Sequence, residues 1–300
     1  MLNARVTWNH GPLVLNEHFD DAGVLNPSLA SDTIVVDSVA PQEQFRSVAE
    51  AYHLATGGAL GRVHKGMAVW RLQGRILVPN DTNQDLRLAD RRRAMRGAFD
   101  PSLCLRDSPS TLGAYALDFS EHTEDLASWP QGYIPCRVYA RPLGVPMLPE
   151  TLNDRGVQAW TIDLLLADPR TYGRTWHSLV LSGAVPSGLA ANVGTSPAPL
   201  GLDILMAGAG ATNFTISRSG VSFALDLSAC TAGQHVNVVM ETAGPFGRGR
   251  YITVAGVEKF SIKASAGDTW LDVPVGGTTF SVSNATNVTS CTLAWLDTWA

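Results

Sequence analysis

Ser290-Cys-Thr-Leu-Ala-Trp-Leu-Asp-Thr-Trp-Ala300 closes the chain with an alternating pattern of large apolar and smaller or polar side chains. Cys291, Leu293 and Trp295 fall on one face of this pattern, which predicts a strand with one buried side. The strand runs to the last residues, so we expect this end of the chain to be held within a sheet. The same pattern recurs from about residue 200 onward, which favours a binding or building module over a reaction centre.

Short stretches of alternating residues recur between residues 200 and 298, with turn residues between them. Regular short strands separated by turns are typical of a β-sandwich. We therefore predict a sandwich whose strands lie at 200–206, 213–217, 221–227, 235–241, 250–254, 258–264, 278–283 and 290–298.

A segment with neither the alternation of a strand nor the periodicity of a helix precedes this sandwich. Residues 183–199 read Gly-Ala-Val-Pro-Ser-Gly-Leu-Ala-Ala-Asn-Val-Gly-Thr-Ser-Pro-Ala-Pro, which predicts a linker or an extended arm. Composition changes at about the same place, because residues 1–178 carry 37 charged side chains and residues 179–300 carry only 12. We expect two domains, at 1–178 and 200–300, joined by a linker at 179–199.

The first domain is expected to be mainly β, with strands at 5–15, 33–39, 48–54, 68–78, 132–140 and 157–167. A turn at Gly57-Gly58 separates two of them. The clearest pattern is at 157–167, where the apolar face is formed by Trp160, Ile162, Leu164 and Leu166.

One helix is predicted within the first domain, at about 83–98. Thr82-Asn-Gln-Asp85 resembles a capping box, and Asp100-Pro101 follows Gly97 as a stop signal. Leu88, Met95 and Phe99 share one face. The remaining surface is basic, and two alternatives stay open for it: a solvated face, or a surface that docks on an acidic neighbour. Its arginines are Arg87, Arg91, Arg92, Arg93 and Arg96.

The charge and apolar content limit the classes of partner. A net charge of -5 and a pI near 5.8 argue against a nucleic-acid or anionic-membrane binder, so we expect no sequence-specific nucleic acid as partner. No apolar run is long enough for a signal peptide or a membrane span, so we expect a soluble chain made in a cytoplasm, with no membrane insertion. The scattered cysteines are expected to be buried thiols: Cys104, Cys136, Cys230 and Cys291.

No motif in the sequence indicates catalysis, a cofactor or a metal. The seven histidines are dispersed, and Gly61–Gly66 lacks the lysine of a phosphate loop because Met67 stands in its place. There is no Gly-x-Ser-x-Gly motif, and Gly244–Gly249 is better explained as a hairpin turn. We therefore predict that the chain is not an enzyme and has no catalytic, cofactor-binding or metal-ligating residues.

The tryptophans offer an alternative function. Exposed indole rings stack on sugars, and Trp270 and Trp299 are the best candidates for such a platform in the second domain. The other interpretation places these rings in the core, because Trp270 and Trp295 lie within strand patterns. A carbohydrate-binding role would require exposed aromatic rings with polar neighbours on one face of the sandwich.

The order of these pieces resembles the distal tail proteins of long-tailed, non-contractile bacteriophages. The resemblance covers essentially the whole chain and depends on the strand–helix–strand order of the first domain, together with several short stretches. These are Trp160-Thr-Ile-Asp-Leu-Leu-Leu-Ala-Asp-Pro-Arg-Thr-Tyr172, Gly194-Thr-Ser-Pro-Ala-Pro-Leu200, Trp270-Leu-Asp-Val-Pro-Val-Gly-Gly277 and Leu293-Ala-Trp-Leu-Asp297.

The resemblance implies a fold and a role. The fold would be an N-terminal split β-barrel with one α-helix, followed by a galectin-like β-sandwich. The role would be that of a virion protein of the tail tip, in which six copies form a ring that joins the tail tube protein to the hub and its fibres. DNA would pass through the lumen of this ring. Contact with host-surface glycans through the sandwich is the alternative.

Overall fold

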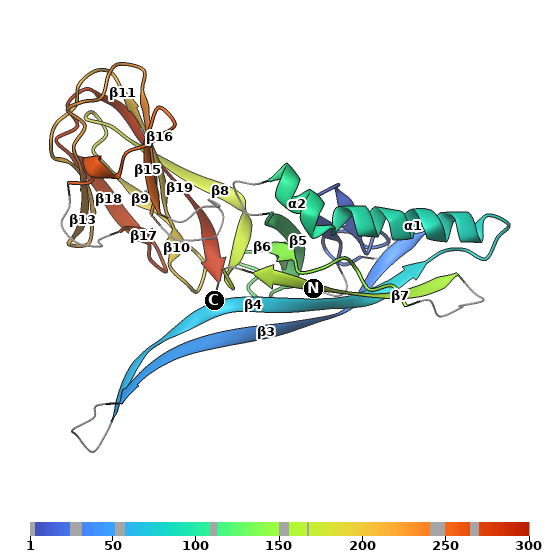
Figure 1. Ribbon diagram of the computed structural model, residues 1–300. Helices are drawn as coiled ribbons and strands as arrows, with labels where there is room; N and C mark the ends of the chain where they lie inside the picture. Colours follow the sequence, from blue (N-terminus) through green and yellow to red (C-terminus); the bar gives the residue numbers. More distant parts are fainter. Residues whose placement is uncertain are drawn as a thin grey trace. The chain divides into compact units, whose positions relative to one another are not determined.

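The computed structural model describes residues 4–24, 32–51, 58–108, 113–149, 156–166, 168–240, 250–264 and 270–299. The chain divides into two compact units, Met1–Pro169 and Arg170–Ala300, called unit 1 and unit 2 below. Both are built mainly from antiparallel strands, as the sequence predicts, and Figure 1 labels their elements.

Unit 1 contains one antiparallel sheet with the strand order β3-β4-β7-β6-β5-β1-β2. Strand β5 was not predicted from the sequence, and β3 and β4 are much longer than expected. The strands are β1 (Val6–Trp8), β2 (Leu13–Leu15), β3 (Thr33–Ala51), β4 (Gly58–Leu77), β5 (Tyr115–His122), β6 (Tyr133–Pro142) and β7 (Val157–Leu166).

The two ends of this sheet approach each other at Asn16, which follows β2. Its backbone N–H donates to the carbonyl of Ile34 over 2.7 Å, and its side-chain Oδ1 accepts from the N–H of Val36 over 2.8 Å. Asn16 is fully buried and adopts a left-handed backbone with φ of 55°. One residue thus links β2 and β3, between which no strand ladder is formed among the described residues.

The core of unit 1 lies on one side of the β3–β4–β7 part of the sheet. The alternation predicted for 157–167 is confirmed: Trp160, Ile162, Leu164 and Leu166 are all buried. They pack with Trp70 of β4 and with neighbouring apolar residues in one cluster. The side chains between them point to the opposite face, because successive strand residues alternate.

Two helices pack on unit 1, where the sequence predicted one. Helix α1 (Gln84–Ala98) buries Met95 and Ala98, and Phe99 follows them into the core. The predicted capping box at Thr82 is wrong, because the N-cap residue is Asn83 and its side chain makes no capping bond. Asp100-Pro101 does end α1, but it also starts helix α2 (Pro101–Asp107): the Asp100 carboxylate accepts from two N–H groups of its first turn.

Unit 2 is a sandwich of two antiparallel sheets, ordered β16-β15-β14-β11-β19-β8 and β13-β12-β18-β9, with β10 and β17 as a separate pair. Its core is a single apolar cluster that includes Cys291, Leu293 and Trp295, as predicted. The strands are β8 (Thr171–Leu181), β9 (Ser187–Ala190), β10 (Ala198–Pro199), β11 (Gly201–Met206), β12 (Phe214–Arg218), β13 (Val221–Leu225), β14 (His235–Val239), β15 (Tyr251–Val254), β16 (Val257–Glu258), β17 (Asp272–Val273), β18 (Thr278–Ser283) and β19 (Val288–Trp299).

The segment predicted as a linker, 179–199, belongs to unit 2 and includes strands β9 and β10. The buried side chain of Asn192 ties this segment to its neighbours by hydrogen bonds. Its Nδ2 donates to the carbonyls of Ser196 and Val273, and its Oδ1 accepts from the N–H groups of Gly194 and Thr298. The boundary between the units accordingly falls at 169/170 rather than near 178.

Two further local predictions have different outcomes. The strand expected at 258–264 is largely a short 3₁₀ helix, Phe260–Ile262. Phe260 is exposed there, so the stretch lacks the buried side that a strand in the sandwich would need. The turn expected at Gly244–Gly249 lies outside the described residues, as does most of the one expected at Gly57-Gly58.

Candidate assembly surface

The longest feature of unit 1 is the hairpin of β3 and β4, which pair from Thr33↔Leu77 to Ala51↔Gly58. Strand β7 pairs with β4 only between Ala68 and Leu77. The remaining part of the hairpin leaves the sheet as a two-stranded arm, which Figure 1 shows in blue. The register shifts three times along β3, and such bulges bend and twist a hairpin.

Both long edges of this arm carry backbone groups without a strand partner in the described residues. Strand β3 pairs with β4 alone, and residues 58–67 of β4 pair with β3 alone. A row of unpaired N–H and C=O groups is a template for a strand of another chain, and natural proteins rarely leave one this long uncovered. The arm is therefore the strongest candidate for contact between copies.

The sheet face opposite the core, formed by β3, β4 and β7, is called the open face below. Its side chains include two arginine–aspartate pairs that bridge strands. Arg71 donates from Nε and Nη2 to the two carboxylate oxygens of Asp163 over 2.7 and 2.8 Å. Arg75 binds Asp37 in the same forked way over 2.8 and 2.7 Å.

These pairs change the acidity of their members. The hydrogen bond from Arg71 lowers the pKa of the Asp163 carboxyl, so this group stays ionised at neutral pH. The hydrogen bonds that Arg71 and Arg75 donate to Asp163 and Asp37 raise the pKa values of these arginines above the usual range. The Arg71–Asp163 pair is therefore fully ionised and internally neutral.

Most arginines of α1 bind other residues of unit 1. As a set they are therefore neither a solvated face nor a free surface for an acidic neighbour, the two alternatives left open by the sequence. Arg87 binds Asp32 and Asp81, Arg91 binds Glu17, and Arg92 donates to Gln158. These three side chains are half-buried. Arg93 and Arg96 are exposed, with Arg93 bound to Asp90 of the same helix.

The tryptophans of unit 2 have three environments. Trp295 is buried in the core, and its Nε1 donates to Ala191. Trp270 is half-buried, with the Arg250 guanidinium 5.3 Å and the Lys263 ammonium 5.2 Å from its ring centroid. Trp299 is also half-buried. Trp176 of β8, which the sequence analysis did not single out, is 44% exposed.

The described residues contain no cluster of three or more histidine, cysteine or acidic side chains that could hold a metal. All four cysteines are buried and unbridged, as predicted. Burial raises the pKa of Cys104 to about 11 and that of Cys291 to about 12, so these thiols stay protonated. Among the described helices, none is both long and apolar enough to cross a membrane.

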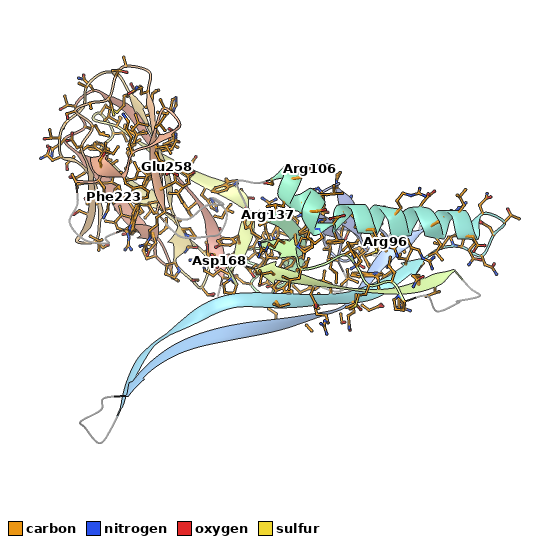
Figure 2. The ribbon with its side chains drawn as sticks, viewed as in Figure 1. Arg96, Arg106, Arg137, Asp168, Phe223 and Glu258 are labelled. Carbon is orange, nitrogen blue, oxygen red and sulfur yellow. The ribbon has the colours of Figure 1, made fainter. Side chains whose placement is uncertain are left out.

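Figure 2 shows the side chains of both units, with Arg137 labelled on β6. Arg137 forms a third forked pair in unit 1, with Asp118 of β5 over 2.6 and 2.9 Å. None of these cross-strand pairs was identified from the sequence. The alternation of Arg71, Gln73 and Arg75 was an available signal, but their partners lie far away in sequence and only the strand register reveals them.

Comparison with solved structures identifies the fold. The chain is similar to the crystal structure of the Dit protein of SPP1, described as a paradigm of the hub adsorption apparatus in phages that infect Gram-positive bacteria. The TM-score is 0.57 at 10% sequence identity, and the match covers 98% of this chain and 99% of that one. The chain therefore has the fold of a distal tail protein along its whole length, as its sequence suggested.

Two structures of the phage P2 baseplate in its activated conformation, with calcium and with strontium, match less well. Their TM-scores are 0.42 and 0.41 at 8% identity, over 97% of both chains. No family model and no curated protein matches the sequence.

Proposed function

We propose that this chain is a structural protein of a phage virion, a distal tail protein at the tail tip. Six copies form a ring through unit 1, and the ring joins the tail tube protein to the hub and its fibres. DNA passes through the lumen. The role is one of assembly, and no reaction is assigned to the chain.

The observation that carries this proposal is the β3–β4 arm, whose edges have no strand partner in the described part of unit 1. Edges of this length are satisfied when identical subunits pair side by side, and a rotation that closes makes a ring. The fold shared with SPP1 Dit along the whole chain supports the same role. A net charge of -5 on each copy also suits a channel that must not retain DNA.

The arm can be tested by shortening it. Residues 44–67 are replaced by Asn-Gly, a two-residue hairpin turn, which keeps Glu43 paired with Ala68 and leaves β4 paired with β7. We expect the shortened chain to fold and to remain a monomer, whereas the full chain forms a hexamer. The mass of each is measured by light scattering after size exclusion. A shortened chain that still forms the full-size ring would show that the arm is not the interface.

A second role, contact with host-surface glycans through unit 2, is favoured by Trp176. This ring is exposed on β8, and Ser178 is a polar neighbour on the same face of the strand. Trp270 is a weaker candidate, because two cationic side chains already approach its ring. A glycan screen of the full chain, with Trp176→Ala as the test and Trp270→Ala as the control, decides between these sites. Binding that Trp176→Ala leaves unchanged would exclude Trp176 as the platform.

A further inference from the structure

We propose that the open face of β3, β4 and β7 lines the lumen of the ring, and that its paired carboxylates keep its arginines from binding the DNA that passes. This inference depends on the proposed ring and assigns the surface of unit 1 that meets DNA. The partner is duplex DNA, and the surface is built to let it slide.

The two faces of this sheet are very different. The core face of the sheet holds Trp70, Trp160 and Leu164, and helix α1 packs on that side. In a closed ring of sheets the outer circumference is the longer one, so the side that carries the bulky core and helix belongs outside. The open face, which has no such layer in the described residues, is left for the inside.

Among the residues of β3, β4 and β7 whose side chains are described, the charges on the open face cancel, and apolar Val35, Val69 and Leu165 lie on the same face. Between the two ion pairs lie uncharged polar side chains: Thr161 opposes Gln73, and the Ser38 hydroxyl donates to Gln73. Arg141 of β6 lies opposite Leu165, on the same side of the sheet, and is an exposed cation at the margin of this face. Around the two ion pairs the wall is therefore polar and neutral, so this part of it has little attraction for phosphates.

Arginine would otherwise be a poor residue for such a wall. A guanidinium binds phosphate through two parallel hydrogen bonds, and each bound phosphate adds a salt-dependent contribution to DNA affinity. In the open face those two donors of Arg71 are already used by Asp163, and those of Arg75 by Asp37. The carboxylates thus occupy the fork and cancel the charge that phosphate would seek.

The test removes the carboxylate charges without changing side-chain size. Asp37→Asn with Asp163→Asn uncovers both arginines. The control, Asp85→Asn with Glu124→Gln, makes the same change in net charge at exposed positions of unit 1. Preassembled rings of each are titrated with a linear plasmid and with the same plasmid as a closed circle, because only a linear duplex can thread a closed ring.

At about 50 mM salt, we expect the wild-type and control rings to bind both the linear and the circular DNA more weakly than a typical non-specific DNA-binding protein does. The Asp37→Asn, Asp163→Asn ring should bind linear DNA at least about tenfold more tightly than the control, with little binding of the circle. Adding Arg71→Gln and Arg75→Gln should abolish that gain.

Two results would overturn the inference. Equal DNA affinity of the test and control rings would show that the carboxylates mask nothing, and equal binding of circle and linear DNA would place the open face outside the lumen. Failure of the proposed function is seen separately, because light scattering on the same wild-type sample would then find no ring. Exposed ion pairs contribute little to stability, so the variants are expected to fold.

Discussion

Asn16 joins the two ends of the unit 1 sheet through one buried side chain. Its Nδ2 donates to the Ala4 carbonyl over 3.1 Å while its Oδ1 holds the N–H of Val36. Asparagine suits this position because it tolerates the left-handed backbone better than most residues and carries both a donor and an acceptor. The link between β2 and β3 therefore depends on a residue that no strand or helix pattern marks.

Asn16→Ala should destabilise unit 1 by about 3 kcal/mol, because it leaves buried backbone groups unpaired and puts alanine in a strained backbone. Asn16→Gly removes the same hydrogen bonds without the strain and should cost less. Urea unfolding of both variants, followed by tryptophan fluorescence, measures the difference. A loss below about 0.5 kcal/mol for Asn16→Ala would mean that other contacts hold β2 and β3 together.

Leu164→Asp should abolish folding of unit 1 and ring assembly with it. Leu164 is fully buried opposite Trp70, and an unpaired carboxylate there costs more than about 4 kcal/mol. Leu165→Asp is the matched control, since the next residue points to the opposite face and lies beside Arg141. Circular dichroism and light scattering compare the two. A soluble Leu164→Asp variant that still forms rings would refute the strand orientation.

Strong periodicity was enough to predict the elements that have a single buried face. Strands β7 and β19 were predicted with their faces correct, because Leu164 and Trp295 each belong to long runs of alternation. Strand β8 was missed: Trp176 and Val180 are exposed on it, so its pattern carries few buried apolar residues. The supposed linker was misread for a related reason: it places only a few apolar side chains in the core, such as Ala190 and Ala198, and hydrogen bonds of Asn192 also hold it.

The extent of unit 2 gives a prediction at the scale of elements. A fragment of residues 170–300 should fold alone, because it has its own core and both complete sheets. A fragment of residues 200–300 should not fold, because it lacks β8, which pairs with β19, and β9, which pairs with β18. Thermal unfolding followed by circular dichroism compares them. A cooperative transition in the shorter fragment would support the linker interpretation instead.

At the scale of the whole molecule, the sequence supplied the order of two β units and a resemblance to distal tail proteins, and the shared fold with SPP1 Dit agrees with both. The surfaces that would meet other copies or DNA were not predictable. The arm and the open face arise from strand pairing between distant segments, such as Asp37 with Arg75 and Arg71 with Asp163. Local sequence holds little information on such pairs, since each partner alone is an ordinary surface charge.

The central claim is that unit 1 assembles this chain into a ring. The most direct measurement is the solution mass of the purified full chain by light scattering after size exclusion, with negative-stain images of the same peak. Six copies of a 32.0 kDa chain give about 192 kDa, and we predict a species of this mass with a central hole. A species that stays at 32.0 kDa over the whole accessible concentration range, with no ring in the images, would contradict the account.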